Sequence, residues 1–354
     1  MSSHQPARGR GAAFNPPNRF DQFHVEPIDV DYLQHEEKPP TPTIFYRDQS
    51  KSILSKNDSP DIPFTYSINP YRGCEHGCVY CYARPSHEYL GFSSGTDFES
   101  KILVKMDAAR LLDEAFRGKR WQPQMVCLSG NTDCYQPVER KLQLTRQCLE
   151  VFLKYRNPIG IITKNFLVAR DIDILRQLAK LDLVQVTISV TTLDKELARR
   201  MEPRTSTPDK RLEAIELLAS NNIPVDVNVA PIIPGLNDEE IPSILQEVAK
   251  KGARSAWYTM VRLPGGVKQL FIDWLEREMK DRARKILGRI RDSHGGELED
   301  TRWGIRFRGE GEIAKAVKSL FQISCDKNGL NKNTFSFNTT HFRIPTDNQL
   351  RMFG

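Results

Sequence analysis

The chain has 354 residues, of which 39% are hydrophobic and 27% charged, a balance that is ordinary for a globular protein and excludes a fibrous one. It contains no apolar run long enough to span a bilayer, and residues 1–20 lack the apolar stretch of a signal peptide, so we expect a cytoplasmic protein without membrane contact. The net charge of +6 favours an anionic partner such as nucleic acid.

The chain divides into three segments along its length. Residues 1–60 are rich in Pro, Asn, Ser and charge, with little apolar periodicity, so we expect a largely irregular N-terminal arm. In residues 61–264, short apolar runs alternate with helical patterns. Residues 265–354 begin with an amphipathic helix, predicted to include 276–291, and then become mixed and polar; we interpret them as a C-terminal extension that caps the central domain.

The central segment reads as six strand–helix units. Strands are predicted at 64–69, 124–128, 159–163, 183–190, 225–230 and 256–262. The helices between them are predicted at 107–116, 141–155, 171–181, 211–220 and 239–250. This alternation is typical of a parallel sheet covered by helices. Six units are too few for an eight-stranded barrel, so the predicted fold class is α/β, a partial (β/α)6 TIM-type barrel.

Three cysteines directly after the first predicted strand carry the main chemical signal. Cys74, Cys78 and Cys81 follow the spacing C-x3-C-x2-C. Thiolates ligate iron–sulfur clusters, and a set of three without an obvious fourth leaves one iron of a cubane open. Two alternatives remain: an electron-transfer iron–sulfur protein, and a zinc-stabilised nucleic-acid-binding protein in which His76 or His87 completes the site. The long βαβ context favours the cluster over zinc.

The same motif resembles the signature of the radical S-adenosylmethionine (radical SAM) superfamily, in which an aromatic residue, here Tyr80, precedes the last cysteine. Residues 69–74, the Glu-Pro-x-Thr run at 202–205 and residues 230–238 resemble its spore photoproduct lyase-like branch, and the N-terminal residues resemble an uncharacterised bacterial subgroup. The resemblance implies a [4Fe–4S] cluster on the three cysteines, SAM as cofactor and a reductant such as flavodoxin or ferredoxin. It also implies a 5′-deoxyadenosyl radical that abstracts hydrogen from a substrate.

The loops after the later strands are expected to hold SAM, because they leave the same face of such a fold. The resemblance places a contact to the SAM amino group in the loop of Ser129, Gly130, Asn131, Thr132 and Asp133, with a plain capping turn as the alternative. The other expected contacts are Lys164 and Arg204 for the SAM carboxylate, Ser189 for the ribose and Ile232 for the adenine. Each also has a simpler interpretation as a solvent-exposed or core residue.

One further cysteine is predicted to act in catalysis. Photoproduct lyase returns a hydrogen atom to its product radical from a thiol, and Cys134 follows the loop 129–133, near the expected open face. Cys127 lies at a similar distance along the chain, and Tyr82 and Tyr135 are further candidates. The alternative is that Cys134 is a non-catalytic thiol. The sequence does not identify a substrate, although its positive charge favours nucleic acid.

Overall fold

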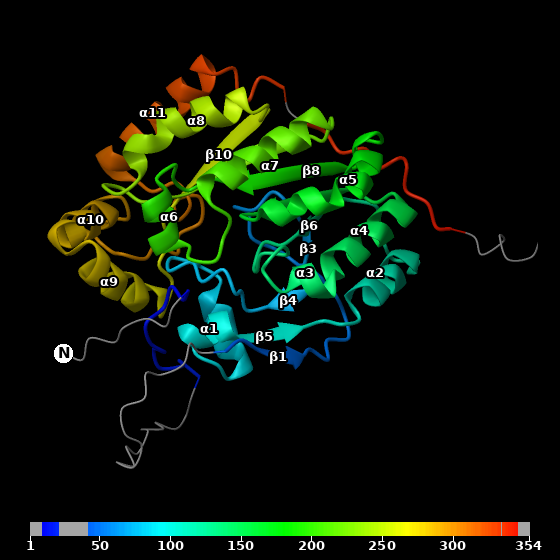
Figure 1. Ribbon diagram of the computed structural model, residues 1–354, viewed down its shortest axis with the longest axis horizontal. Coiled ribbons are helices and arrows are strands. Elements are labelled where there is room, and N and C mark those ends of the chain that lie inside the picture. Colours follow the sequence, from blue (N-terminus) through cyan, green and yellow to red (C-terminus); the bar gives the residue numbers. More distant parts are fainter. Residues whose placement is uncertain (1–8, 21–41, 334, 346–354) are drawn as a thin grey trace, which may run out of the picture.

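The computed structural model describes residues 9–20, 42–333 and 335–345 (Figure 1). Its main sheet has the strand order β10-β9-β8-β7-β6-β3-β2. The strands are β2 Leu54–Lys56, β3 Tyr66–Ile68, β6 Val126–Leu128, β7 Ile159–Thr163, β8 Val184–Ser189, β9 Val225–Ile232 and β10 Ser255–Met260. All neighbours run parallel except β2, which is antiparallel to β3. Within the described residues the edge strands β10 and β2 do not pair, so the predicted partial barrel of parallel strands is confirmed.

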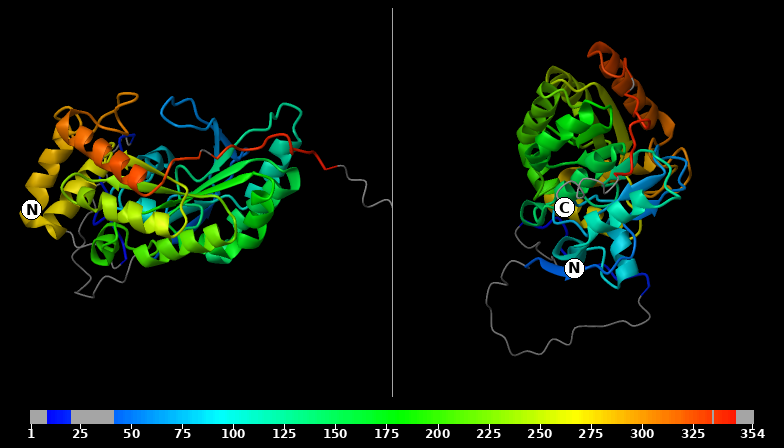
Figure 2. Two further views of the ribbon diagram at one scale, coloured as in Figure 1. Left: turned by 90° about the horizontal axis from the view of Figure 1, so that it is seen from above. Right: turned by 90° about the vertical axis from the view of Figure 1, so that its right-hand side faces the viewer.

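Helices follow the strands and cover one side of the sheet (Figures 1 and 2). The five longer ones in the central segment match the predicted helices: α2 Ala108–Arg117, α4 Leu144–Tyr155, α5 Ile172–Ala179, α7 Pro208–Ser220 and α8 Ile241–Lys250. The shorter elements are α1 Thr96–Ser100, α3 Glu139–Leu142, α6 Lys195–Met201, η1 Arg84–Leu90, η2 Phe166–Asp171 and η3 Asp238–Glu240. The predicted rhythm of strand and helix is therefore correct.

The two faces of the parallel sheet differ in chemistry, because successive side chains of a strand point to opposite faces. The face toward the helices is apolar and contributes Ile68, Val126, Leu128, Ile159, Ile161, Val184, Val186, Ile188, Val225, Val227 and Val229 to the main core. The alternate residues of β3, β6, β7, β8 and β9, which we call the inner row, are more polar: Ser67, Cys127, Gly160, Ile162, Gln185, Thr187, Ser189, Asp226, Asn228 and Ala230. The inside of the partial barrel is thus the side available for polar ligands.

A second, smaller sheet lies beside the barrel and was not predicted. Its strands are β1 Ile44–Arg47, β5 Lys101–Val104 and β4 Tyr71–Arg72, in the order β1-β5-β4. Both β1 and β2 fall in the segment expected to be an N-terminal arm, of which residues 1–8 and 21–41 lie outside the described residues. Because β4 is followed directly by the cysteine motif, this sheet fixes where that motif begins.

In its described part, the C-terminal segment contains three helices, α9 Val267–Glu278, α10 Lys280–Asp292 and α11 Gly311–Lys327. The helix predicted over 276–291 is correct for α10, but the chain leaves helical geometry at Met279, where φ is −136°, and so separates α9 from α10. α11 lies along α8 on the outside of the barrel (Figure 1). Among the described residues, no helix has both the length and the apolar character needed to cross a lipid bilayer.

Candidate active site

The three motif cysteines lie on one tightly packed loop, residues 73–81, which we call the cysteine loop. Gly73 has a φ of 83° and Gly77 a φ of 68°, a left-handed conformation that favours glycine. A Cβ atom on Gly73 would lie 3.0 Å from the carbonyl oxygen of Phe98, so the loop backbone is also confined sterically. All three cysteines are free thiols; the first two are buried and the third is partly exposed.

The surroundings of the cysteine thiols oppose free thiolates. Burial raises the pKa of Cys78 well above its usual value, Glu202 adds to this, and Lys164 opposes it. Burial also raises the pKa of Cys81, against the effect of Arg84. Thiolates here therefore need a cationic centre to stabilise them. Within the described ranges, no three His, Cys, Asp or Glu side chains converge as ligands of one ion do.

The two histidines considered as a fourth zinc ligand are engaged elsewhere. Nδ1 of His76 lies 3.4 Å from a carboxylate oxygen of Asp133, and its Nε2 lies 3.1 Å from the side-chain nitrogen of Asn165. Burial acts to lower the pKa of His76, whereas Asp133 and the Cys74 thiol raise it. Nε2 of His87 lies 2.9 Å from the carbonyl oxygen of Lys101. Both imidazoles therefore belong to the scaffold of the cysteine loop.

A buried network fixes Tyr80, the aromatic residue of the motif. Its hydroxyl donates to the carboxylate of Glu202, which also accepts from Oγ1 of Thr191 at 2.7 Å. Arg211 pairs with the second carboxylate oxygen, and the side chains of Glu202 and Arg211 are 0% and 1% exposed. Arg211 also donates to the main-chain oxygen of Ser189 at 3.1 Å. The network joins the cysteine loop to the end of β8 and gives the Glu-Pro-x-Thr run a role that the sequence analysis did not assign.

The loop 129–133 is largely satisfied by its own hydrogen bonds. Oγ of Ser129 donates to the main-chain oxygen of Thr132 at 2.7 Å. The carboxylate of Asp133 accepts from Oγ1 of Thr163 and from the main-chain nitrogen of Lys164, both at 2.8 Å. Burial acts to raise the pKa of Asp133, but the pairing with His76 described above lowers it to about 2. These contacts show that the loop is a structured turn at the end of β6.

The two remaining members of that loop lie beside Tyr82. The carbonyl oxygen of Gly130 accepts from the Tyr82 hydroxyl, and Nδ2 of Asn131 donates to Oγ of Ser86 at 3.2 Å. The ring of Tyr82 is 51% exposed, in contrast to the buried Tyr80. The loop and the end of the cysteine motif therefore meet at one surface.

Lys164 and Ser189 lie at the carboxyl ends of β7 and β8, on the inner side of the sheet. Nζ of Lys164 lies 5.9 Å from the centroid of the Tyr80 ring. Burial lowers the pKa of Lys164, while the nearby Cys78 thiol raises it. Ser189 pairs in register with Asn228 of β9, whose buried Oδ1 finds no hydrogen-bond partner among the described residues. This end of the inner row thus carries a cation near the cysteine loop and an unsatisfied polar atom.

Arg204 and Ile232 lie in different surroundings from these. The main-chain nitrogen of Arg204 donates to the carbonyl oxygen of His76 at 3.2 Å, and its Nη1 lies 3.6 Å from the Glu75 carboxylate. Ile232 is fully buried in the main core, at the end of β9. Nη1 of Arg204 is therefore within ion-pair distance of a loop carboxylate but has no hydrogen-bond partner among the described residues, and Ile232 is a core residue.

The two candidate thiols outside the motif lie on opposite sides of the sheet. Cys134 is completely buried in the apolar core between sheet and helices, and burial raises its pKa well above the usual value. Cys127 belongs to the inner row, because Val126 and Leu128 on either side of it face that core. Burial raises the pKa of Tyr82, and the Cys81 and Cys127 thiols raise it further.

A basic and aromatic segment, residues 302–308, links the two edges of the open barrel. The main-chain nitrogen of Met260, at the end of β10, donates to the carbonyl oxygen of Phe307 at 2.9 Å. The main-chain nitrogen of Gly304 donates to the carboxylate of Asp61, in the loop between β2 and β3, at 2.7 Å. The segment therefore lies across the lateral opening that an incomplete barrel leaves.

The side chains at this opening combine exposed aromatic surface with positive charge. Trp303 is 57% exposed, and the guanidinium carbon of Arg306 lies 4.0 Å from its ring centroid. The guanidinium carbon of Arg262 lies 4.7 Å from the centroid of Phe307. Nε of Arg262 is buried and has no hydrogen-bond partner within the described part of the chain. Sequence analysis missed these residues, although the alternation of Arg with Trp and Phe at 302–308 was a visible signal.

Comparison with known protein families agrees with this geometry. The model of the Radical SAM superfamily matches residues 68–248, a range that contains all three motif cysteines. The chain belongs to the radical SAM superfamily. An uncharacterized protein of Mycobacterium tuberculosis is 35% identical over 251 residues, which cover 69% of this chain and 74% of that protein. One of Methanocaldococcus jannaschii is 31% identical over 176 residues, which cover 49% of this chain and 63% of that protein.

Solved structures of spore photoproduct lyase share the fold. The lyase complexed with dinucleoside spore photoproduct matches with a TM-score of 0.59 at 18% sequence identity, over 81% of this chain and 80% of that chain. A lyase mutant with bound AdoMet and the same dinucleoside has a TM-score of 0.59 at 18% identity, over 83% of this chain and 82% of that chain. The predicted family resemblance is confirmed, and membership of this superfamily supports an enzyme that uses SAM and an iron–sulfur cluster.

Proposed function

We propose that this radical SAM protein holds a [4Fe–4S] cluster on Cys74, Cys78 and Cys81 and acts on nucleic acid. When bound, the cluster chelates SAM at its fourth iron and supplies the electron that cleaves SAM to methionine and a 5′-deoxyadenosyl radical, which takes a hydrogen atom from the substrate. A reductant such as flavodoxin or ferredoxin provides that electron. The observation that carries the proposal is the position of three thiols, two of them buried, on one loop at the mouth of an open parallel barrel.

Different residues of the chain are proposed to bind the carboxylate, the ribose and the amino group of SAM. Lys164 is proposed to bind the SAM carboxylate in preference to Arg204, because Lys164 faces Tyr80 and the cysteine thiols while Arg204 faces Glu75. Asn228 has an unsatisfied buried oxygen and is proposed, with its neighbour Ser189, to bind the ribose hydroxyls. Main-chain groups of the loop 129–133 are proposed to meet the SAM amino group, because its Ser, Thr and Asp side chains already have partners.

A SAM-cleavage assay tests the cofactor chemistry. We expect anaerobically reconstituted protein to hold about four iron and four sulfide per chain, as a cubane requires. After reduction it should convert SAM to 5′-deoxyadenosine and methionine, and a Cys74/Cys78/Cys81→Ala triple variant should lose both cluster and cleavage. Colourless protein with one bound zinc ion would support the zinc alternative instead. A cluster whose EPR signal ignores added SAM would support electron transfer.

The lateral opening supports nucleic acid as the substrate class. Exposed aromatic rings stack on bases of any sequence, and arginines beside them bind the phosphates. Trp303 offers such a ring, and Arg262 has neither a hydrogen-bond partner nor a carboxylate within ion-pair distance among the described residues. Arg262 also lowers the pKa of Tyr82, against the effect of burial. The lateral opening is thus proposed to lead from the exposed ring of Trp303 to the inner row.

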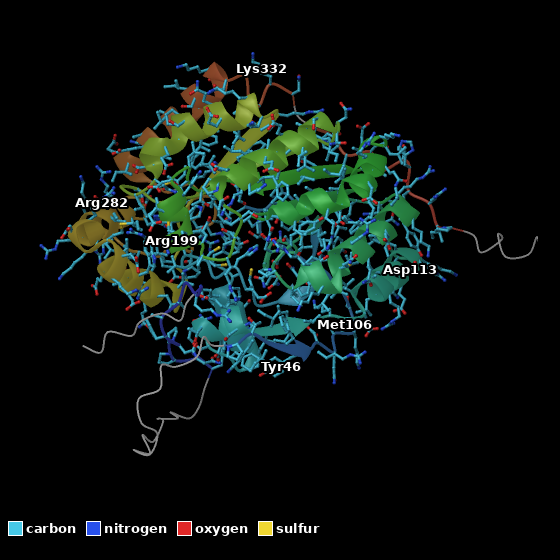
Figure 3. All side chains as sticks on the ribbon, viewed as in Figure 1. Tyr46, Met106, Asp113, Arg199, Arg282 and Lys332 are labelled. Carbon is cyan, nitrogen blue, oxygen red and sulfur yellow. The ribbon has the colours of Figure 1, made fainter. Side chains whose placement is uncertain are left out.

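Binding of a fluorescein-labelled single-stranded oligonucleotide, measured by anisotropy, tests this assignment. Trp303→Ala should weaken binding roughly 5- to 150-fold, the equivalent of one lost base stack. Arg262→Ala should weaken it and reduce the slope of log K against log salt by about 1. Arg199→Ala is the matched control, because Arg199 is exposed on α6 and ion-paired with Glu196 (Figure 3). Equal affinities for all four proteins would remove nucleic acid from the proposal and leave the SAM chemistry intact.

A further inference from the structure

Residues 9–20, which we call the clasp, pack against the outer side of the cysteine loop without forming a helix or strand. The main-chain nitrogens of Gly11 and Ala12 donate to the two carboxylate oxygens of Glu99, at 3.0 and 2.8 Å. Farther along, Oδ1 of Asn15 accepts from the main-chain nitrogen of Asp97 at 3.0 Å, at the start of α1. The clasp is therefore held by specific hydrogen bonds to a buried part of the fold.

Glu99 connects the clasp to a cluster ligand. Its side chain is 0% exposed and forms an ion pair with Arg84, which is also 0% exposed. Arg84 in turn donates through Nε and Nη2 to the main-chain oxygen of Cys78, at 3.0 and 2.9 Å. The buried guanidinium of Arg10 donates to the main-chain oxygen of Glu99. A chain of charge-assisted hydrogen bonds thus runs from the clasp to the second cysteine.

Two glycines allow the clasp to approach this closely. A Cβ atom on Gly11 would overlap the carbonyl oxygen of Gly77, which lies between the first two cysteines of the motif. A Cβ atom on Gly95 would overlap the carbonyl oxygen of Phe14 and lie 2.7 Å from Cα of Asn15. Neither glycine has the positive φ that by itself would favour glycine. At both glycines, the main chain of the clasp therefore packs directly on the main chain of the rest of the protein.

We infer that the clasp is part of the cluster site: it braces the cysteine loop through Glu99 and Arg84, and it covers the outer side of the loop against solvent and oxygen. With the clasp in place, Cys74 and Cys78 are only 6% and 9% exposed. Glu99 and Arg84 act as positioning residues, because they reach the cluster only through the backbone of Cys78. This inference rests on the proposed cluster at the three cysteines.

Hydrogen exchange on the full-length apoprotein tests the brace without a cluster. Gly11→Ala and Gly95→Ala place the same methyl group on opposite sides of the interface, so each should release the clasp. Peptides covering 9–20 and 73–82 should then exchange at least tenfold faster, while peptides of α8 stay unchanged. The control is Gly288→Ala on α10, where an added Cβ meets nothing within 4 Å. Asn15→Ala, which removes three hydrogen bonds to Thr96 and Asp97 without adding a clash, serves if a glycine variant fails to fold.

The reconstituted holoprotein gives a second readout. In air, the visible absorbance of the cluster should bleach several-fold faster in both glycine variants than in wild type or Gly288→Ala. The double variant should resemble the single ones, because both substitutions release the same segment. The inference is overturned if residues 9–20 exchange faster while 73–82 keep wild-type protection, or if neither substitution releases the clasp. Absence of a cluster would refute the proposed function, yet the exchange data would still decide whether the clasp braces the loop.

Discussion

The buried ion pair of Glu202 and Arg211 makes the scaffold of the cysteine loop sensitive to the loss of a single charge. Glu202→Gln keeps the size of the side chain but leaves the guanidinium of Arg211 with only neutral acceptors: the main-chain oxygens of Ser206 at 2.9 Å and Ser189 at 3.1 Å, and Oγ1 of Thr205 at 2.6 Å. Because the two side chains are 0% and 1% exposed, water cannot replace the lost carboxylate. Breaking a buried pair in this way costs about 3–5 kcal/mol.

Urea unfolding of the apoprotein, followed by circular dichroism, measures this loss. Glu196→Gln is the control, because its pair with Arg199 has side chains 52% and 69% exposed and should contribute nothing measurable. The double variant Glu202→Gln/Arg211→Met should regain part of the stability, because it removes the unpaired charge. The reasoning is refuted if Glu202→Gln loses less than about 1 kcal/mol and the double variant is no more stable than the single one.

Three further predictions concern titration and the thiols. Burial lowers the pKa of His87 to about 4. As the pH falls below 6.5, His87 is therefore protonated in the unfolded chain but stays neutral in the folded protein. Between pH 7.5 and 4, wild type should therefore lose up to about 3 kcal/mol more stability than His87→Phe; equal losses in urea titrations would contradict this. Burial raises the pKa of Asp226 to about 6, so above that pH the folded protein must hold a buried carboxylate that the unfolded chain ionises freely from 3.8. Asp226→Asn should accordingly stabilise the protein by up to about 3 kcal/mol at pH 8 and should not stabilise it at pH 3.5; a gain of the same size at both values would exclude this origin. The sequence predicts Cys134 as the hydrogen donor, whereas the inner-row position favours Cys127. Cys127→Ala should change the distribution of products while SAM cleavage continues, and Cys134→Ala should not; the reverse pattern, read by mass spectrometry of the products, would restore Cys134.

The barrel could be predicted because each of its strands and helices has a recognisable local pattern of apolar residues. Runs such as 159–163 and 183–190 are apolar, lie between helical patterns and fold as β7 and β8. The small sheet escaped prediction because β4 has only 2 residues and β1 only 4, too few for a periodic pattern. Its strands are defined by their pairing partners, which lie far away in the sequence.

The only part of the site that could be predicted with a specific role was the cysteine motif, because its residues are close together in the sequence. The cysteine spacing is local, but the partner of Tyr80 is a glutamate 122 positions farther along the chain. The contact between Gly11 and Glu99 spans 88 positions, and nothing in either segment's composition indicates it. Arg204 shows the opposite difficulty: its charge and place in the chain suit a SAM ligand, whereas a loop carboxylate lies beside it. Such pairings depend on the folded backbone, which residue type alone does not specify.

The separation of an apolar outer face from a polar inner row has a consequence for how this family diversifies. Side chains of the outer face hold the helices on the sheet, so substitutions there carry a cost in folding. Inner-row positions such as Gln185 and Thr187 lie outside that core and are free to vary with the molecule that enters the barrel. Relatives can therefore preserve the outer face and the three cysteines while they exchange one substrate for another. Two relatives that share a third of their residues can therefore act on different substrates.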